Sequence, residues 1–486
     1  MDALLGLDIG TTNIKVAAYG RDGTLLAQAS RPTPTALQGL RRASHDPNIL
    51  WEETVATVRA VTSQLKGNRV MGLAIASIGE AGVPLDAHGV PLYPIIAWYD
   101  ERTVPQAAWW AKTMGEVETY RHTGLPLGHT FTLHKLLWLR ETEPDVYRRI
   151  ARWLCVSDYM AYRLTGEQCM GYSLASRTMA FDPAERRWSV EMLAHAGLSA
   201  DCLPELKPEG SLVGTLQTDA ARQVGLPQGT PVYVGGHDHV CGALAVGACR
   251  PGIVLDSTGT TEAELATLLS VEDRLREPNL AFCLGCHVAR HRYYAIGSIL
   301  GAGSTMSWLA NLLWPSQGQD REAALQALTR EAAASPPGAK GLYLLPHMAG
   351  AGSPDRDPTA RGVLAGLSLE HTRADIARAA VEGLAFELRV LWEALEGFTG
   401  QSIERVISVG GGTRNALWNQ IKADVTGRTL EIREQAEAVT LGAALLAGLG
   451  VGVYRDEDEA LQSIQVASHP VSPDPRYEER YARLYA

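Results

Sequence analysis

The stretch that decides the fold is Leu4-Leu5-Gly6-Leu7-Asp8-Ile9-Gly10-Thr11-Thr12-Asn13-Ile14-Lys15-Val16. A short apolar strand ends near Asp8, a Gly-Thr-Thr turn follows, and a second apolar run leads away from the turn. Backbone N–H groups and hydroxyls in such a turn can cradle a phosphate, and glycine permits the close approach that a phosphate needs. An acidic residue at the strand end can hold Mg²⁺ by way of water. The stretch therefore predicts a phosphate site, with an ordinary glycine hairpin as the alternative.

The same pattern occurs a second time, in Leu255-Asp256-Ser257-Thr258-Gly259-Thr260-Thr261. A third glycine turn follows an apolar strand, in Val406-Ile407-Ser408-Val409-Gly410-Gly411-Gly412-Thr413-Arg414-Asn415. Backbone without side chains there would let an adenine or a ribose lie against the chain. The pattern differs from the G-x-G-x-x-G and G-x-x-x-x-G-K-[ST] motifs. Two phosphate turns in two halves of the chain predict two related lobes that face one nucleotide.

Two further segments carry a resemblance to a known family. The first is Gly362-Val363-Leu364-Ala365-Gly366-Leu367, with Asp375-Ile376 and Ala379-Ala380-Val381-Glu382 after it. The second is Thr132-Leu133-His134-Lys135-Leu136-Leu137-Trp138-Leu139. Here Thr130 and Thr142 stand where the family usually has other residues, which loosens any inference about the substrate. On these motifs the chain resembles the FGGY family of carbohydrate kinases, in the superfamily of sugar kinases, actin and heat-shock ATPases.

The resemblance implies an α/β fold of two ribonuclease-H-like (actin-like ATPase) domains with an interdomain active-site cleft. A chain of 486 residues is also too long for one hydrophobic core, and two domains are the natural expectation. We place an FGGY N-terminal domain at residues 1–247, on the sugar and Mg/phosphate side. An FGGY C-terminal domain at residues 248–486 takes the nucleotide side. Lobe closure would then exclude water from the reaction.

Composition narrows the class of partner. The net charge of −10 argues against a nucleic-acid backbone as partner, because no basic stripe is evident. The sequence offers neither a signal peptide nor an apolar stretch long enough to span a membrane. The odd number of cysteines, seven, fits reduced thiols in a cytoplasm. We therefore predict a cytoplasmic protein with a small-molecule sugar or polyol substrate, and the resemblance allows a homodimer.

One cysteine cluster spells a haem-attachment motif, Cys283-Leu284-Gly285-Cys286-His287. The residues around it predict a strand, on which Cys283 and His287 point to one face and Cys286 to the other. The three side chains would then not converge on one ion. We interpret the motif as a coincidence, with adventitious zinc as the alternative.

The predicted catalytic base is Asp238, which follows the strand Pro231–Gly235 and two glycines. Phosphoryl transfer to an alcohol needs a base near the hydroxyl. In the FGGY family the Asp at this strand end accepts the sugar hydroxyl proton. The alternative is that Asp238 caps the helix that begins near Val240. Asp8 and Asp238 are also the two residues predicted to bind Mg²⁺.

The resemblance implies an ATP site drawn from both halves of the chain. The first turn and a following basic residue would face the ATP phosphates, and the second turn would face the β- and γ-phosphates. A later glycine would lie near the ribose, and the third turn would hold the adenosine. These residues are Thr11, Thr12, Lys15, Gly259, Thr260, Gly303, Gly411, Gly412 and Asn415. A solvated surface lysine is the alternative for Lys15, and a helix N-cap role for Asn415 is compatible with adenosine binding.

The predicted sugar site is Gly79, Glu80, Trp98, Asp100 and His239. Glu80 stands where glycerol kinases carry a glutamate that bonds substrate hydroxyls, whereas xylulokinases typically carry a Met-His pair across this stretch. A carboxylate suits neighbouring hydroxyls because it accepts two hydrogen bonds. Trp98 could stack on the substrate and Asp100 could bond a hydroxyl.

Three residues in or beside this site have less defined roles. Arg102 is predicted to pair with Asp100. His237 and His239 flank the base, where each could contact the sugar, tune Asp238 or simply pack.

The leading hypothesis is ATP-dependent phosphorylation of a primary hydroxyl of a ketose, a xylulose-like pentulose or a hexulose. Glycerol, erythritol, gluconate and autoinducer-type substrates remain alternatives. A non-catalytic, actin-like nucleotide-dependent binding protein is a hypothesis from another class, against which the paired Asp8 and Asp238 argue. An acyl or carbamoyl kinase on the same fold would lack the motif over 362–382.

Overall fold

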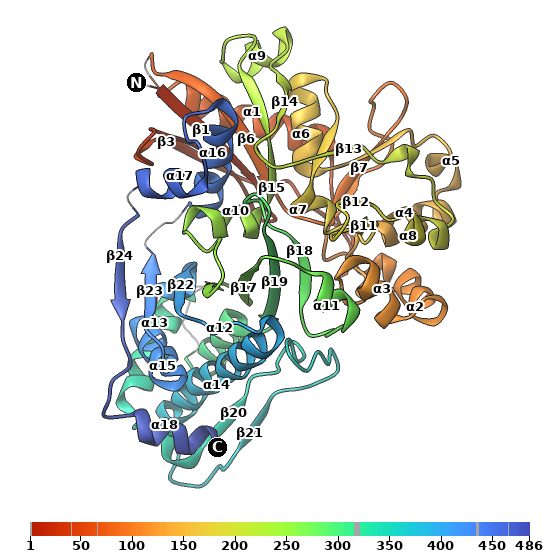
Figure 1. The fold of residues 1–486 in the computed structure, drawn as a ribbon. Coiled ribbons are helices and arrows are strands. Elements are labelled where there is room, and N and C mark those ends of the chain that lie inside the picture. Colours follow the sequence, from red (N-terminus) through yellow and green to blue (C-terminus); the bar gives the residue numbers. More distant parts are fainter. Residues whose placement is uncertain (1, 40, 66, 315–320, 434–436, 465) are drawn as a thin grey trace. The chain divides into compact units, whose positions relative to one another are not determined.

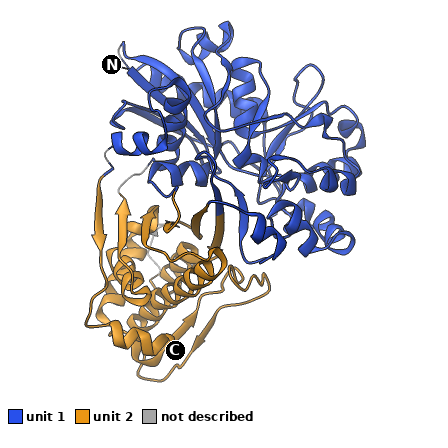
Figure 2. Cartoon of the chain, in the orientation of Figure 1, with its two compact units in different colours: residues 1–249, 269–294, 437–466 blue, residues 250–268, 295–436, 467–486 orange. Residues whose placement is uncertain are grey.

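The computed structural model describes residues 2–39, 41–65, 67–314, 321–433, 437–464 and 466–486 (Figure 1). Contacts divide the chain into two compact units (Figure 2): unit 1 is Met1–Cys249, Leu269–Tyr294 and Glu437–Val466, and unit 2 is Arg250–Leu268, Ala295–Ala436 and Ala467–Ala486. The chain thus leaves unit 1 two residues after the predicted division and returns to it twice. The division into sequence domains at 247 and 248 stays a prediction.

Unit 1 is built on a six-stranded sheet in the order β14-β15-β6-β1-β2-β3. Strand β1 pairs antiparallel with β2 and parallel with β6, and β6 is parallel to β15. The strands are β1 (Asp2–Ile9), β2 (Asn13–Tyr19), β3 (Leu25–Pro32), β6 (Arg69–Ser77), β14 (Leu212–Thr215) and β15 (Pro231–His237).

Helices cover both faces of this sheet, and its central strands are therefore buried on both sides. Leu5, Leu7 and Ile9 join the core with α1 and α6, while Gly6, on the opposite face, lies so close to α16 that a Cβ would meet the Thr440 carbonyl oxygen at 1.8 Å. By strand alternation Asp8 shares the face of Gly6. The helices on the sheet are α1 (Pro47–Thr62), α6 (Val156–Thr165), α9 (Thr218–Val224), α10 (Asp238–Ala245) and α16 (Ala438–Val451).

Unit 1 also contains a second core around buried tryptophans and leucines of α2 and α4. The remaining helices of unit 1 are α2 (Val104–Thr113), α3 (Glu116–Thr123), α4 (Thr132–Thr142), α5 (Pro144–Tyr147), α7 (Tyr172–Ala175), α8 (Val190–Ala196), α11 (Glu272–Arg276) and α17 (Glu457–Ser463). Its short strands are β4 (Ala36–Leu37), β5 (Ala43–His45), β7 (Gly82–Leu85), β8 (Ile95–Ile96), β9 (Arg152–Cys155), β10 (Cys169–Gly171), β11 (Phe181–Asp182), β12 (Arg187–Trp188), β13 (Glu205–Lys207) and β18 (Cys283–Cys286).

Unit 2 repeats the same sheet plan. Strand β16 pairs antiparallel with β17 and parallel with β22, and β22 is parallel to β23. The strands of this sheet in unit 2 are β16 (Ile253–Thr258), β17 (Glu262–Leu268), β19 (Tyr293–Ile299), β22 (Arg405–Val409), β23 (Leu430–Arg433) and β24 (Ser468–Val471). Strands β20 (Tyr343–Leu345) and β21 (Val363–Ala365) form a separate two-stranded sheet. The helices are α12 (Ala302–Leu313), α13 (Arg321–Ala334), α14 (Arg373–Thr399), α15 (Ala416–Thr426) and α18 (Glu478–Tyr485).

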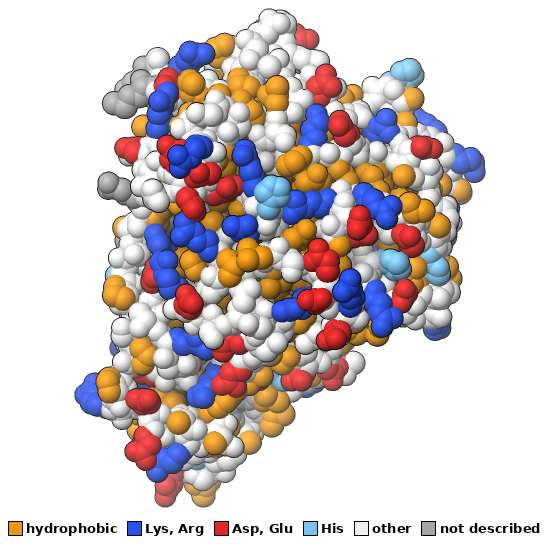
Figure 3. Space-filling view, in the orientation of Figure 1, with side chains coloured by type: hydrophobic (Ala, Val, Ile, Leu, Met, Phe, Trp, Pro, Cys, Tyr) orange, Lys and Arg blue, Asp and Glu red, His pale blue; other side chains and the backbone are white. Residues whose placement is uncertain are grey.

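Each unit therefore has an antiparallel hairpin beside two parallel strands, which is the ribonuclease-H-like arrangement that the family resemblance implied. None of the helices in the described part of the chain combines the length and apolarity that a membrane span needs. On the face shown in Figure 3, acidic and basic side chains are interspersed, as on an ordinary solvated surface.

Candidate active site

The first glycine turn joins β1 to β2 and lies directly beyond a buried carboxylate. Asp8 is 8% exposed, and its Oδ1 has no hydrogen-bond partner among the described residues. Burial, and then the nearby charge of Asp238, raise the pKa of Asp8 well above its usual value, while Lys15 lowers it. A buried, unsatisfied carboxylate is costly, so this position favours a cation or a proton.

The turn itself is open. Thr12 is exposed, and its carbonyl oxygen accepts a hydrogen bond from the N–H of Thr33 at 2.9 Å. The hydroxyl oxygen of Thr11 accepts a hydrogen bond from the Trp98 indole N–H at 3.0 Å. The structure thus brings a predicted phosphate residue and a predicted sugar residue into contact.

Lys15 lies opposite Asp8 in the β1–β2 pair. Its ammonium is 3.2 Å from a carboxylate oxygen of Glu437, and its side chain is 33% exposed. Lys15 is thus an ion-paired lysine rather than a free surface lysine, and its predicted phosphate contact stays a prediction.

The predicted base is the first residue of α10, directly after β15. The side chain of Asp238 is 20% exposed, and its Oδ1 accepts a hydrogen bond from the N–H of His239 at 2.6 Å. Burial raises the pKa of Asp238, and His239 lowers it. The helix has no side-chain N-cap bond, so the alternative of a capping aspartate gains no support. A partly exposed carboxylate with a raised pKa is suited to accept a proton.

The two histidines beside the base differ. His237 is 7% exposed, and burial lowers its pKa well below the usual value, so its imidazole is neutral. His239 is exposed and stacks on His237 with ring centroids 5.7 Å apart. The exposed ring is the one that a substrate can reach.

The stretch after β6 places a second carboxylate near the base. Glu80 is 6% exposed and has a positive φ of 61°, and its Oε1 accepts a hydrogen bond from Arg177 Nε at 2.7 Å. A Cβ on Gly79 would lie 3.0 Å from Arg177 Cγ and 3.1 Å from His237 Cδ2. The close packing that glycine allows here brings Glu80, Arg177 and His237 together.

Arg177 was not predicted. It follows α7, 97 residues from its partner Glu80, and no local pattern marks it. The guanidinium lowers the pKa of both His237 and Asp238. It therefore lies within electrostatic reach of the predicted base.

The hydrogen bonds of Asp100 do not support its predicted contact with a substrate hydroxyl. Its side chain is 0% exposed, and it accepts hydrogen bonds from the Ala43 N–H at 2.7 Å and the Arg102 N–H at 2.9 Å. Arg102 adds a bidentate pair at 2.8 Å for each bond, which confirms the predicted pairing. Four donors fill the lone pairs of a carboxylate, so Asp100 has no capacity left for a substrate hydroxyl.

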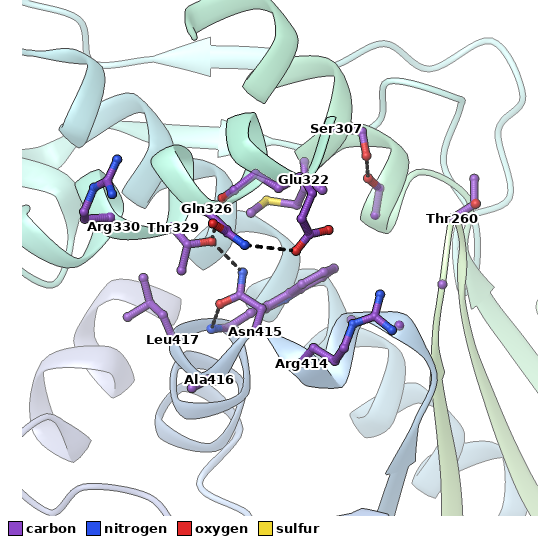
Figure 4. Close-up of a pocket in the computed structure, with 17 residues that line it drawn as sticks. Thr260, Ser307, Glu322, Gln326, Thr329, Arg330, Arg414, Asn415, Ala416 and Leu417 are labelled. Atoms are coloured by element: carbon purple, nitrogen blue, oxygen red, sulfur yellow. Dashed lines mark hydrogen bonds between the residues drawn. The ribbon is translucent and has the colours of Figure 1, made fainter. Parts of the chain in front are cut away.

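Unit 2 contains a cavity of about 740 Å³ between the second and third glycine turns (Figure 4). Six of the predicted nucleotide residues line it: Gly259, Thr260, Gly303, Gly411, Gly412 and Asn415. The N–H of Gly303 donates to the Gly259 carbonyl at 3.1 Å, and a Cβ on Gly303 would lie 2.2 Å from that oxygen. The start of α12 can therefore approach the phosphate turn only because this residue is glycine.

The opposite wall of the cavity comes from α13, which the sequence did not connect with the site. Its lining residues are Glu322, Leu325, Gln326, Thr329 and Arg330. Asn415 faces this wall, and its Nδ2 donates to Thr329 Oγ1 at 3.0 Å (Figure 4). Asn415 Oδ1 accepts a hydrogen bond from the Trp418 N–H at 3.1 Å, which confirms the helix N-cap.

The cysteine motif lies on β18, as predicted. Cys283 is half-buried, Cys286 is buried, and neither forms a disulfide. Among the described residues, the cluster with the geometry of a metal site is Asp256, Glu262 and Glu264 instead. Nothing in this part of the chain therefore favours zinc over coincidence.

Two ribonuclease-H-like units, one with a buried carboxylate before its glycine turn and one with a glycine-lined cavity, define an actin-like ATPase fold. The model of the "FGGY family of carbohydrate kinases, N-terminal domain" matches residues 3–245, and that of the C-terminal domain matches residues 254–451. The chain belongs to the FGGY family of carbohydrate kinases. It is an ATP-dependent kinase that phosphorylates a carbohydrate.

Individual relatives agree with this assignment. A xylulose kinase of Staphylococcus epidermidis is 28% identical over 488 residues, covering 100% of this chain and 95% of that protein. An L-fuculokinase of Salmonella typhi is 31% identical over 463 residues, covering 94% of each protein. The crystal structure of a xylulose kinase from Rhodospirillum rubrum matches with a TM-score of 0.91 and 31% identity, over 99% of this chain and 96% of that one.

Proposed function

We propose that this chain transfers the γ-phosphate of ATP to a primary hydroxyl of a ketose, a pentulose of the xylulose kind. The observation that carries the proposal is Asp238, a partly exposed carboxylate with a raised pKa at the end of β15. The names of the xylulose kinase relatives support the pentulose. The seven free cysteines support the predicted cytoplasmic location.

In the proposed reaction, Asp238 accepts the proton of the substrate hydroxyl. The oxygen attacks the γ-phosphorus, the bond from phosphorus to the bridging oxygen breaks, and ADP leaves. Thr11 and Thr12 of the first turn, and Gly259 and Thr260 of the second, are the proposed phosphate-binding residues. Their open turns offer backbone N–H groups and hydroxyls, which suit phosphate oxygens.

Mg²⁺ fits the acidic side of the site. Asp8 offers an unpartnered, buried Oδ1, and Asp238 lies close enough to raise the pKa of Asp8. Carboxylates that act through water are the ligands Mg²⁺ prefers. When bound, the ion neutralises charge on the phosphates.

The nucleotide base and ribose occupy the cavity of unit 2. Gly411 and Gly412 provide a wall without side chains, and Gly303 lies near the ribose. Asn415 is the N-cap of α15 and donates a hydrogen bond to Thr329. The cavity volume of about 740 Å³ is within the range of small-ligand sites.

On the sugar side, Gly79, Glu80, Trp98 and His239 form the binding surface. Glu80 accepts hydrogen bonds from substrate hydroxyls, and Trp98, 38% exposed, offers its ring to the C–H face of the substrate. Asp100 shapes this surface through Arg102 and makes no substrate contact.

A sugar acid or polyol is the second candidate substrate. The Arg177 guanidinium beside Glu80 and Asp238 favours the sugar acid, because guanidinium groups bind carboxylates. Gluconate would fit this feature better than xylulose does.

The test is an assay of ADP release from Mg-ATP with a panel of ketopentoses, ketohexoses, polyols and sugar acids. We expect the highest kcat/KM with a ketopentose. A preference for a sugar acid would favour the second candidate. ATP turnover that no small molecule stimulates would contradict both.

A further inference from the structure

A buried polar cluster lies next to the phosphate turn of unit 2. Asp256 is on β16, Glu262 and Glu264 are on β17, and the turn over 259–261 joins these two strands. One carboxylate oxygen of each lies within 4.8 Å of the others, and all three residues are 0% exposed. So many buried acids are costly unless they are neutralised and hydrogen-bonded.

A single lysine from α15 enters this cluster. Lys422, which is 2% exposed, donates from Nζ to Thr258 Oγ1 at 2.7 Å and to Asp256 Oδ2 at 3.0 Å. It also forms an ion pair with Glu262. Thr258 and Glu262 are separated by three residues, which form the phosphate turn. The ammonium therefore holds both ends of that turn.

Further hydrogen bonds fix the surrounding groups. Asp256 Oδ2 accepts a hydrogen bond from Ser408 Oγ on β22 at 2.7 Å, and Asp256 Oδ1 accepts one from Thr258 Oγ1 at 2.9 Å. Glu264 Oε2 accepts one from Trp392 Nε1 on α14 at 2.6 Å. The cluster thus ties β16 to β22 and β17 to α14.

Only some of the acids in the cluster carry a full charge at neutral pH. Burial raises the pKa of Asp256, but Lys422 and the hydrogen bond from Ser408 lower it, and the net shift of the pKa is downward, so this carboxylate is ionised. Burial raises the pKa of Glu262 to about 7, so this group is near its midpoint at neutral pH, and it raises the pKa of Glu264 well above its usual value, which favours the protonated form. The ammonium therefore faces one full carboxylate charge on Asp256 and a partial one on Glu262.

The same lysine also contacts a residue that lines the nucleotide cavity. Its ammonium lies 5.2 Å from the ring centroid of Trp418, one turn earlier on α15, and Trp418 lines the cavity. Thr258, which Lys422 holds, packs under the third glycine turn, since a Cβ on Gly412 would lie 2.4 Å from Thr258 Cγ2. The phosphate turn, the glycine wall formed by Gly411 and Gly412, and Trp418 are therefore all held, directly or through Thr258, by the buried Lys422.

We propose that Lys422 is a positioning residue for the nucleotide: its buried ammonium holds the phosphate turn, the glycine wall and the first turn of α15 in the arrangement that binds ATP. The inference rests on the proposed function in one respect, that ATP occupies the cavity of unit 2. Lys422 touches neither ATP nor sugar and acts through Thr258, Glu262 and Trp418.

The first test replaces Lys422 by Met, which removes the charge and keeps most of the volume. We expect KM for ATP and Kd for ADP to rise about tenfold or more, the scale of a lost charge-assisted hydrogen bond. KM for the sugar stays within about twofold, since the sugar residues are in unit 1. ADP binding is measured by calorimetry, sugar-dependent turnover by ADP release, and stability by Tm.

The matched control is Lys340→Met in the same unit. Lys340 also pairs with a buried carboxylate, Asp375, at 3.0 Å, and it is not among the residues that line the cavity. Equal loss of ADP affinity in both variants, or unchanged ADP affinity in Lys422→Met, would overturn the proposal.

A second arm keeps the test decisive if Lys422→Met fails to fold. The double variant Asp256→Asn/Lys422→Met removes both charges at once and leaves no unpaired ion. In addition, Lys422→Ala is assayed with propylammonium, which replaces the lost atoms, and with propanol as the uncharged control. Recovery of ADP affinity with propylammonium alone supports the proposal, whereas equal effects of both additives contradict it.

The proposal and the proposed function fail in different ways. Absence of sugar-dependent turnover in the unaltered protein would contradict the function. Because ADP binding is measured without sugar, the role of Lys422 is still decided in that case.

Discussion

Two turns with nearly the same sequence pattern have opposite electrostatic environments. Asp8 precedes the turn over 10–12, and Asp256 precedes the turn over 259–261, each on the central strand of its unit. Asp8 has an oxygen without a partner and a raised pKa. Asp256 has bonds on both oxygens from Lys422, Ser408 and Thr258, and a lowered pKa.

The comparison separates a reactive position from a structural one. A buried carboxylate that the fold satisfies stabilises the fold, and one that the fold leaves unsatisfied is available to a ligand. We therefore expect the same local motif to serve metal and phosphate chemistry in unit 1 and to support a nucleotide wall in unit 2.

The largest effect is expected from Asp8→Asn. Loss of the carboxylate removes the proposed Mg²⁺ partner, so kcat falls by about 10²-fold or more, the scale of one electrostatic contact to the transition state. The Tm does not fall, because the buried charge was unsatisfied. Initial rates over a range of Mg²⁺ concentrations, together with a thermal melt, check both parts. A variant that melts lower with unchanged kcat would reverse the assignment.

The matched change in unit 2, Asp256→Asn, should instead lower the stability of the fold. It leaves the Lys422 ammonium without its ionised partner, and breaking a buried pair costs about 3–5 kcal/mol. Denaturant unfolding at about pH 6, where Glu262 (pKa about 7) still holds its proton, measures the loss. An unchanged free energy of unfolding would contradict the structural role of Asp256.

A smaller effect sharpens the roles within unit 1. Glu80→Gln should raise KM for the sugar about tenfold, the scale of a hydrogen bond to a charged group, and leave KM for ATP within about twofold. Glu205→Gln, at a side chain 72% exposed, is the control. A change in KM for ATP alone would remove Glu80 from the sugar site.

The smallest effect concerns pH. Burial raises the pKa of Glu209 from 4.5 to about 7, and its Oε1 accepts a hydrogen bond from the Ser173 N–H at 2.6 Å. The folded state therefore binds a proton that the unfolded state has lost, and this stabilisation disappears as pH rises from 4.5 through about 7. Relative to the unaltered protein, Glu209→Gln should gain Tm between about pH 5 and pH 8. A Tm difference that is independent of pH would contradict this.

The features that could be predicted from the sequence are those formed by residues close to one another along the chain. The hairpin turns around Gly10 and Gly259, the N-cap at Asn415 and the Asp100–Arg102 pair each depend on a few adjacent residues. Strand-turn-strand and capping patterns are local, so they are readable without tertiary structure.

The missed features depend on contacts between distant segments. Arg177 meets Glu80 across 97 residues, and Lys422 meets Asp256 across 166. The return of 269–294 and 437–466 to unit 1 has no composition signal. Asp100 has the right residue type for a sugar ligand, but the Ala43 N–H, from a remote segment, helps to fill its oxygens. No periodicity or motif encodes such pairings.

The most direct test of the central claim compares the unaltered protein with Asp238→Ala in sugar-dependent ADP release, with ADP binding measured in parallel. The account predicts that kcat falls by about 10²–10⁴-fold, the typical contribution of a general base, while ADP affinity stays the same. A variant that retains more than about a tenth of the rate would contradict Asp238 as the base.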